Sequence, residues 1–475
     1  MQVQAMHFKA RAGQRLADVR LQQNLKKLAG KFVTARAAAM EELADFEAIR
    51  SEAVRRRNAA LAQLDGWLEA FEAEASRRGS TVLWAETPQE ASALVVEIAR
   101  RHGVQRATKT KSMVSEEMAL NAALEAVGVQ VTETDLGEYI LQINDYEPPS
   151  HIIAPVVHKD RQQVAELFRR EHLRERPEGW ENDIAGMARE AREVLRERFL
   201  AADMGITGGN FVVAETGSVA LVTNEGNEGL CTVLPRVHVA ITGIEKVLPT
   251  LDDLATVMRL LPRSATGQVI SNYFSLLTGP RAPGETDGPE HNYVILLDGG
   301  RTGLIGGEFQ DMLRCIKCGA CMNHCPVYQK IGGHSYGWVY PGPMGSVLTP
   351  SYVGLEKTLD LPHAATLCGQ CQVVCPMKIP LPELLRKLRE RQFDRGLRPR
   401  GERALLAAWG WLARRPALYR VASRLAVRLL AALAPDGRLR NLPGARGWTV
   451  GRDLPAPAGR TFRDLYRARR DTRGG

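Results

Sequence analysis

Seven of the eight cysteines in this chain fall into two short runs, and their spacing is the strongest chemical signal in the sequence. The first run reads CIKCGACMNHCP and places Cys315, Cys318, Cys321 and Cys325 at the spacing C-x2-C-x2-C-x3-C-P. In this spacing three thiolates converge on one iron-sulfur cluster, and the fourth reaches a neighbouring cluster. The pattern therefore predicts a pair of clusters.

A second run supplies the other side of the pair. Cys368, Cys371 and Cys375 follow, again closed by a proline, and the place of a leading cysteine is taken by Ala365. The pairing rule for two-cluster ferredoxins assigns Cys315, Cys318, Cys321 and Cys375 to the first cluster, and Cys325, Cys368 and Cys371 to the second.

The second cluster is therefore one protein ligand short. Either a non-cysteine group such as His363 or Thr366 fills the corner, or one iron is open to an exogenous ligand or absent. We expect two [4Fe-4S] clusters, with a [3Fe-4S] cluster or a non-cysteine ligand as the alternatives for the second.

Two other uses of clustered cysteines, a zinc site and a disulfide framework, fit the spacing less well. Zinc also binds thiolates, but zinc sites usually present two separated C-x2-C or Cys/His pairs rather than three cysteines at successive x2 spacings. A disulfide framework fits less well, because the chain lacks a secretory signal pattern and the cysteines crowd into one region. Iron-sulfur clusters are the preferred interpretation.

Length, composition and charge limit the number of domains, the location and the kinds of partner. The 475 residues, 44% of them hydrophobic, allow two or three domains with cores of their own. The sequence shows no signal peptide and no apolar run long enough to span a membrane, so we expect a cytoplasmic protein. The net charge of +9 is uneven: residues 386–475 hold 23 basic and 7 acidic residues, whereas the remainder is net negative. Such a tail suits an acidic partner, an anionic membrane face or nucleic acid.

The patterns divide the chain into four regions. Residues 1–77 are rich in helix formers with apolar residues at helical spacing. Residues 78–300 alternate short apolar strands with helices, which predicts an α/β fold with a largely parallel sheet. Residues 301–390 hold the cysteine runs, and residues 391–475 form the basic segment. Specific expectations are a helix over 114–127, a strand over 151–155, a helix over 352–359 and an irregular, Arg-rich end.

Three loops of the α/β region, residues 109–117, 134–142 and 208–227, carry weaker signals in their polar groups. The turn from Glu215 to Ser218 contains a glycine and could expose backbone N–H groups to an anion, although structural turns look the same. His151 and His158 flank the predicted strand and are interpreted as structural. Cys231 is interpreted as a small buried hydrophobe.

Several of these stretches together resemble the lactate utilisation protein B family, the iron-sulfur subunit of a bacterial three-protein system that oxidises L-lactate to pyruvate. The resemblance rests on PSHIIAPVVHKDRQQVAELF, on the AETGS turn with VLPRVHVAITGIEKVLPT after it, on both cysteine runs, and on YGWVYPGPMGSVLTP between them. It implies an α/β domain similar to the CoA-transferase and sugar-isomerase fold, followed by an α-helical ferredoxin-type domain. It also implies partners, namely the other subunits of a lactate oxidation complex.

Three functions compete. The leading hypothesis is an electron-transfer subunit, because no G-x-G-x-x-G after a strand and no P-loop is recognised, and nothing else in the chain supplies hydride chemistry. The second is a redox enzyme whose α/β domain binds a small anionic substrate near the incompletely ligated cluster. The third, a nucleic-acid-binding protein, is suggested only by the tail, and we expect no nucleic-acid partner. Peripheral membrane contact through the tail is left open, and the catalytic residues are unknown.

Overall fold

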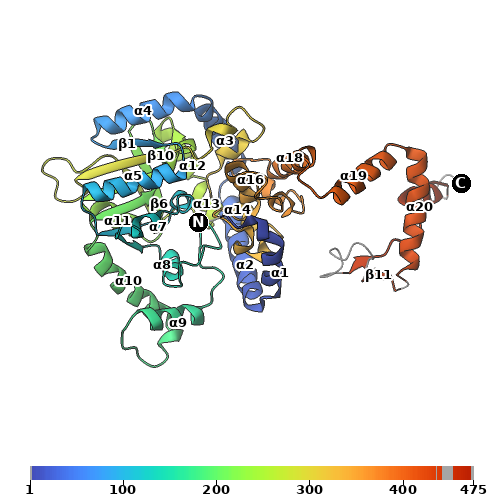
Figure 1. Ribbon diagram of the computed structural model, residues 1–475, viewed down its shortest axis with the longest axis horizontal. Helices are drawn as coiled ribbons and strands as arrows, with labels where there is room; N and C mark the ends of the chain where they lie inside the picture. The colour runs from blue at the N-terminus through green and yellow to red at the C-terminus, as the bar shows by residue number, and fades with distance from the viewer. Residues whose placement is uncertain (1–2, 435, 441–452, 472–475) are drawn as a thin grey trace. The chain divides into compact units, whose positions relative to one another are not determined.

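The computed structural model describes residues 3–434, 436–440 and 453–471 of the chain (Figure 1). It divides into two compact units, Met1–Gln392 and Phe393–Gly475. The first unit contains the α/β region, the cysteine runs and the N-terminal helices. The second contains the basic C-terminal segment.

A six-stranded sheet forms the centre of the first unit. Its strands are β1 (Thr81–Ala85), β2 (Arg106–Lys109), β3 (Gln130–Glu133), β4 (Met204–Gly208), β7 (Val237–Gly243) and β10 (His291–Leu297), in the order β1-β10-β7-β4-β2-β3. All neighbours are parallel. Every residue of β7 and β4 is buried, as expected of parallel strands with both faces covered. The predicted α/β fold class with a parallel sheet is confirmed.

A second, four-stranded sheet lies beside the first in the chain's α/β region. It has the order β8-β5-β6-β9, formed by β8 (Val247–Leu248), β5 (Phe211–Val213), β6 (Ser218–Thr223) and β9 (Tyr273–Leu277). The helices of this region are α5 (Pro88–Arg101), α6 (Met113–Glu117), α7 (Leu120–Glu125), α8 (Leu136–Gln142), α9 (Arg161–Glu171), α10 (Ile184–Leu200), α11 (Asn227–Val233), α12 (Leu251–Met258) and α13 (Leu261–Ala265).

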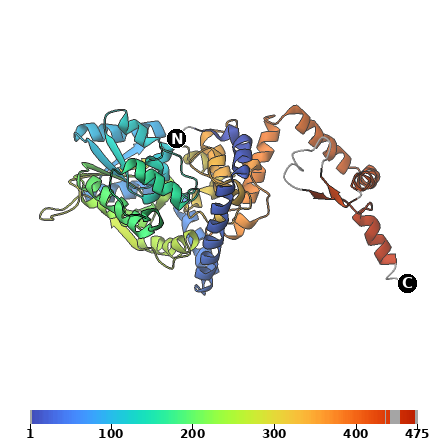
Figure 2. The same ribbon diagram turned by 90° about the horizontal axis from the view of Figure 1, so that it is seen from below.

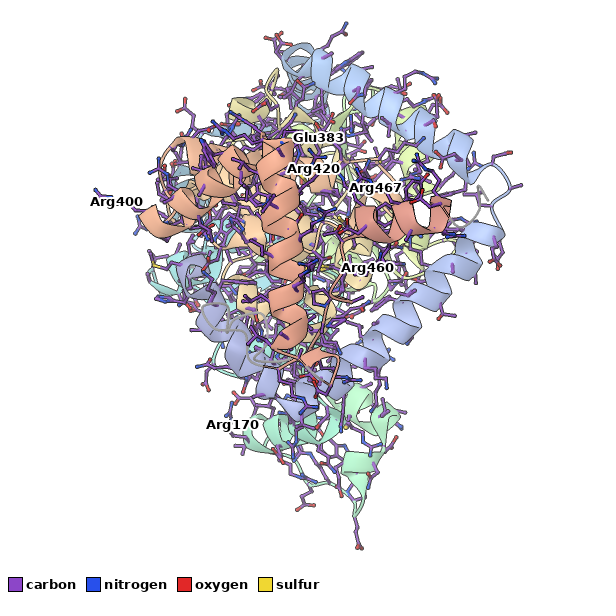
Figure 3. The ribbon with its side chains drawn as sticks, turned by 90° about the vertical axis from the view of Figure 1, so that its right-hand side faces the viewer. Arg170, Glu383, Arg400, Arg420, Arg460 and Arg467 are labelled. Atoms are coloured by element: carbon purple, nitrogen blue, oxygen red, sulfur yellow. The ribbon has the colours of Figure 1, made fainter. Side chains whose placement is uncertain are left out.

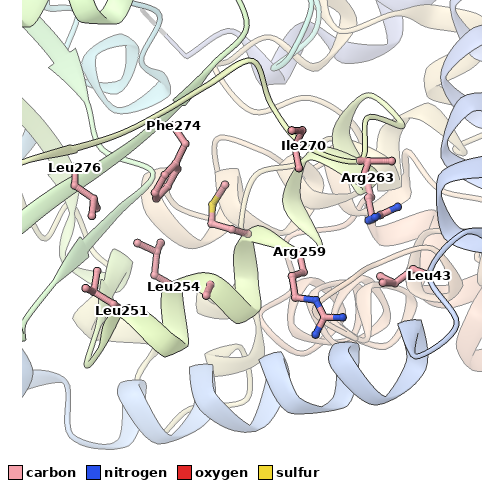
Figure 4. A pocket seen from close by; sticks show the side chains of 11 residues that line it. Leu43, Leu251, Leu254, Arg259, Arg263, Ile270, Phe274 and Leu276 are labelled. Carbon is pink, nitrogen blue, oxygen red and sulfur yellow. The ribbon is translucent and has the colours of Figure 1, made fainter.

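One edge of the smaller sheet is apolar and exposed. Phe274 and Leu276 of β9 face Leu251 and Leu254 of α12 across a groove of about 520 Å³ (Figure 4). Phe274 is 47% exposed. An exposed edge strand with apolar side chains is unusual in a monomer, where such edges are commonly shortened, charged or covered.

The N-terminal helices serve two different parts of the first unit. Figures 1 and 2 both show α1 (Phe8–Ala17) and α2 (Val19–Glu41) alongside the helices of the cysteine region. Lys9 forms a 2.9 Å ion pair with Asp360 there. In contrast, α4 (Leu64–Arg77) packs against the sheets, and its Phe71 is fully buried in that core. Helix α3 (Phe46–Ala62) contacts both parts, because its Arg57 donates to the carbonyl of Val247 in β8 and to that of Leu313 in the cysteine region.

The cysteine region is made of short helices and turns. It contains η5 (Gln310–Arg314), α14 (Ala320–Asn323), α15 (Tyr328–Ile331), α16 (Gly342–Val353), α17 (Gln370–Val373) and α18 (Leu381–Asp394). The remaining 3-10 turns are η1 (Ala5–His7), η2 (Trp180–Asn182), η3 (Ile244–Lys246), η4 (Thr302–Leu304), η6 (His334–Tyr336) and η7 (Leu361–His363).

Three local predictions were wrong. The helix predicted over 114–127 is broken, because Ala119 adopts a left-handed conformation between α6 and α7. The stretch 151–155 forms bends and turns, in which the His151 ring accepts bonds from the Ile153 and Ala154 amides. The helix expected over 352–359 instead covers Gly342–Val353, in which Pro343 lies in the first turn, where a proline is tolerated.

The second unit is built around two helices, α19 (Arg400–Ala413) and α20 (Pro416–Ala432). It also contains the strand pair β11 (Arg438–Leu439) and β12 (Leu454–Pro455), and α22 (Phe462–Asp471). A 2.5 Å ion pair between Arg424 and Asp464 joins α20 to α22, the helices on which Figure 3 labels Arg420 and Arg467. The expected irregular end is therefore helical as far as Asp471, and residues 472–475 lie outside the described part. In the described residues, no helix is long and apolar enough to cross a membrane.

Candidate iron-sulfur centre

The structure brings four of the predicted thiols around one small hollow. Cys315, Cys318 and Cys321 approach it from the turn before α14 and from α14 itself, and Cys375 approaches it from the end of the second run. Met312, Met344 and Leu381 are among the apolar residues that close it. The amide of Lys317 lies 3.4 Å from the sulfur of Cys315, a backbone N–H contact of the type that tunes cluster potentials.

The other three thiols line a second hollow. Cys325 comes from the first run, and Cys368 and Cys371 come from the second, with Ala365, Thr366 and Pro382 as neighbours. This hollow has an exposed thiol, Cys368, whereas the four thiols of the first hollow are buried or half-buried. The two groups are the two ligand sets that the pairing rule predicts.

The backbone repeats between the two runs. Lys317 and Gly319 of the first run adopt positive φ angles of 53° and 77°, and Leu367 and Gly369 of the second adopt 55° and 85°. A non-glycine residue rarely adopts this conformation, so its recurrence at matching positions indicates a repeated turn. In this repeat Ala365 stands where Cys315 stands in the first run.

Two polar side chains besides the thiols line the second hollow, Thr366 and Gln370. Thr366 lines it, and a hydrogen bond with the Thr366 side chain lowers the pKa of the Cys368 thiol. His363 is exposed, does not line the hollow, and places Nε2 3.0 Å from Oε1 of Gln392. Of the two candidate groups, only Thr366 is positioned near the three thiols.

Electrostatics favour a metal in both hollows. Burial and then the neighbouring Cys375 and Cys315 raise the pKa of Cys318 to about 12, and burial and then Cys325 raise that of Cys371 to about 12. Thiols packed together in this way do not all ionise unless a strong positive charge compensates them, and a bound metal supplies that charge. Neither lining contains a histidine, aspartate or glutamate, so the donors are soft sulfur, which fits iron-sulfur clusters.

Arginines from the N-terminal helices hold the second run in place. Arg50 of α3 donates through Nε to the carbonyl of Cys375 at 2.8 Å, and Arg36 of α2 donates to Val374 at 2.7 Å. Both also place positive charge beside a cluster site that becomes anionic when its thiolates bind iron. Sequence reasoning missed them, since nothing in the pattern of a helix far upstream indicates which carbonyls its arginines reach.

A buried polar network joins the first run to the parallel sheet. Lys246, just after β7, donates to the carbonyl of Cys315 at 2.5 Å, and Lys317 donates to the hydroxyl of Tyr340 at 2.6 Å. Arg301 pairs with Glu117 at 2.8 Å and with Glu245 at 2.6 Å. Lys317 lies inside the cysteine motif, and Glu117 and Lys246 lie in stretches that the sequence analysis singles out, but the sequence did not show that these segments meet.

The weaker candidates lie outside both thiol-lined hollows. His151 is buried, and its Nε2 lies 2.9 Å from Oδ1 of Asn323. His158 contacts Ser150 at 2.8 Å. Cys231 is fully buried, as interpreted, and burial raises its pKa to about 12. The Glu215–Ser218 turn joins β5 to β6 and lines none of the hollows described in this section.

Comparison with known proteins agrees with this architecture. The sequence matches the LUD domain over residues 68–297, the 4Fe-4S dicluster domain over 311–379, and the "Lactate utilisation protein B, C-terminal" family over 386–471. The predicted order of an α/β domain followed by a ferredoxin-type domain is thereby confirmed.

Several relatives match this chain over nearly its whole length. Lactate utilization protein B of Lysinibacillus sphaericus is 42% identical over 97% of each chain. That of Geobacillus kaustophilus is 44% identical over 91% of each chain, and that of Bacillus licheniformis is 40% identical over 100% of this chain and 99% of the relative. The chain therefore belongs to the lactate utilization protein B family.

Proposed function

We propose that this chain is an electron-transfer subunit that relays electrons between partner proteins during the oxidation of L-lactate to pyruvate in the cytoplasm. The observation that carries the proposal is the pair of thiol-lined hollows, of which the second has an exposed thiol. Two neighbouring clusters suit one-electron steps, and the names of the relatives supply the substrate.

The proposed ligands follow the two hollows. Cys315, Cys318, Cys321 and Cys375 hold the first cluster, and Cys325, Cys368 and Cys371 hold the second. Both clusters are of the [4Fe-4S] type, with Thr366 or an exogenous ligand at the open corner of the second; a [3Fe-4S] cluster is the alternative there. The bound clusters supply the redox chemistry, and the protein sets their potentials through ligands, hydrogen bonds and burial.

Exposure suggests a direction for the relay within the chain. The second hollow has an exposed thiol, Cys368, whereas Cys318 and Cys375 of the first are buried. We propose that the second cluster exchanges electrons with a partner subunit at the surface, and that the first is the interior end. The partners are the other subunits of a lactate oxidation complex, and no nucleic acid is involved.

The experiment separates a relay from an enzyme that acts alone. A strain that lacks this chain and any other lactate dehydrogenase is expected not to grow on L-lactate, and a Cys318→Ser variant is expected not to restore growth. The purified, cluster-loaded chain is expected to show no lactate-dependent bleaching until its partners are added. Rapid reduction of the isolated chain by lactate would instead assign lactate chemistry to this chain.

A further inference from the structure

A hollow of about 390 Å³ lies where several strands of the six-stranded sheet end. Its lining includes Thr110–Ser112 after β2, Gly208–Asn210 at the end of β4, and Thr242 of β7. Ile316 and Lys317, between the first two cysteines of the first run, complete its wall. Ligands of open α/β sheets bind at the carboxyl ends of the strands, so this position is the expected place for one.

Three lysines line the hollow, namely Lys111, Lys246 and Lys317, and Lys111 also lies near enough to Glu225 for its charge to oppose the burial that raises the pKa of that carboxyl group. Lys246 is 5% exposed, and its ammonium contacts the Cys315 carbonyl and, at 3.5 Å, Glu245. Because an ammonium has three donors, one is left for a ligand. Lys317 donates to Tyr340. Lys111 lines the hollow and forms no hydrogen bond or ion pair with any residue that the structure describes.

Carboxyl groups gather in the same lining from two other loops. Glu225 and Glu228 come from the segment after β6, and Asp135 precedes α8. Glu225 accepts a 3.0 Å bond from the amide of Leu136, and burial followed by the nearby Asp135 raises its pKa to about 7. A carboxyl group of this kind accepts a hydrogen bond from a hydroxyl, or donates one to a carbonyl when it is protonated.

We propose that this hollow binds a small carboxylate with a hydroxyl or carbonyl on the adjacent carbon. The carboxylate of the ligand pairs with Lys111 and Lys246. The ligand's hydroxyl or carbonyl oxygen meets the carboxyl groups of the lining, Asp135, Glu225 and Glu228. The assignment of the ligand class to 2-hydroxy and 2-oxo acids rests on the proposed function. The site borders the first, complete ligand set rather than the incomplete one, so bound ligand lies beside the interior end of the relay.

A consequence for the cluster follows from charge. An anion beside the Ile316–Lys317 turn disfavours the addition of an electron to the first cluster, since net charge near a cluster is one of the determinants of its potential. Binding is therefore expected to lower the midpoint potential of the first cluster. Binding of a ligand in the α/β hollow would thus change electron transfer through the first cluster without any reaction in the hollow.

The test uses the full cluster-loaded chain without partners, titrated anaerobically by calorimetry with L-lactate, pyruvate and propionate. Saturable one-to-one binding of L-lactate or pyruvate is expected, with propionate at least about fivefold weaker because it leaves buried polar groups unpaired. Lys111→Gln is expected to weaken binding at least about fivefold, because a charge-assisted contact is lost. Lys27→Gln, on the exposed face of α2, makes the same change of charge outside the hollow and is the matched control.

A second readout is the potential of the first cluster, followed by EPR during a redox titration with and without pyruvate. A downward shift that Lys111→Gln abolishes and Lys27→Gln retains supports the site. Absence of saturable binding at millimolar concentrations of both acids, or equal weakening by the two lysine variants, overturns it. Neither measurement requires partners, so the relay can fail in the growth experiment while binding persists, and the reverse.

Discussion

At the scale of single residues, the two ligand sets differ in one position. Ala365 of the second run corresponds to Cys315 of the first, and the turns around both positions share the same positive φ angles. The difference between a complete and an incomplete set is thus one side chain on a repeated backbone. Two predictions follow from it.

Cys321→Ser is expected to destroy the first cluster. Its thiol is half-buried among the other proposed ligands, and desolvation raises its pKa well above the ordinary value. A serine oxygen there is a poor replacement for a soft thiolate. Iron content is expected to fall from about seven or eight atoms per chain to about half of that. Cys231→Ser changes a cysteine outside both hollows and is expected to leave iron unchanged; stoichiometric zinc without visible absorption in the parent protein would refute the cluster assignment.

Ala365→Cys is expected to complete the second ligand set. The repeat places the new thiol at the position that Cys315 occupies in the first turn, so a cluster with an open or missing iron gains its fourth ligand. Iron per chain is expected to rise towards about eight, and any [3Fe-4S] EPR signal of the oxidised protein is expected to disappear. An unchanged spectrum and iron count would mean that the corner is already filled by another group.

At the scale of elements, the Glu215–Ser218 turn shows how a glycine that suggests an anion-binding turn can instead be required for packing. Gly217 has a φ of +65°, and a Cβ there would lie 2.4 Å from the backbone nitrogen of Ala75 in α4. The glycine therefore allows the β5–β6 turn to pack tightly against a helix. The turn does not line the 390 Å³ hollow, so the loop that looked like an anion site serves packing.

Gly217→Ala is accordingly expected to destabilise the protein by about 1–3 kcal/mol, through strain at positive φ and the clash with α4. Gly66→Ala lies on α4 itself, where a Cβ meets nothing within 4 Å, and is expected to stabilise by about 0.5–1 kcal/mol. Thermal unfolding of the two variants measures the difference. A Gly217 variant that keeps its stability but loses ligand binding would reverse this interpretation.

Elements with a local signal were predictable from the sequence. Apolar strands such as β7 predicted a parallel sheet, and the cysteine spacing predicted which thiols line each hollow. The break at Ala119 was not predictable, because the flanking residues favour helix and the left-handed conformation is imposed by the surroundings. The loops 109–117, 134–142 and 208–227, which carry sequence signals, contribute to the lining of the 390 Å³ hollow, but the sequence did not show that they meet Lys246 and Lys317 from two further segments.

At the scale of the whole molecule, charge is divided between the two units. The basic residues concentrate in the C-terminal segment, whose helices α19, α20 and α22 contain no buried residues. Exposed apolar side chains lie among the arginines, including Trp409, Trp411, Leu425 and Leu429. A helix with such a face normally packs against something. The exposed Cys368 of the second hollow and these exposed apolar side chains are both features that suit a subunit of a complex.

We therefore expect the C-terminal segment to dock an acidic protein partner of the relay. A chain without residues 401–475 is expected to retain its iron, because every proposed ligand precedes the deletion, and to bind the other subunits at least about tenfold more weakly at low ionic strength. Raising the salt concentration is expected to weaken the full chain towards the truncated one, since exposed charges are screened over about 10 Å at 0.1 M. Analytical ultracentrifugation of both forms with the purified partners measures the two effects.

Equal affinity of the full and truncated chains for the partners at low salt would make the segment structural. Recruitment of the full chain to anionic vesicles, without any effect of the truncation on subunit binding, would assign the basic face to a membrane surface.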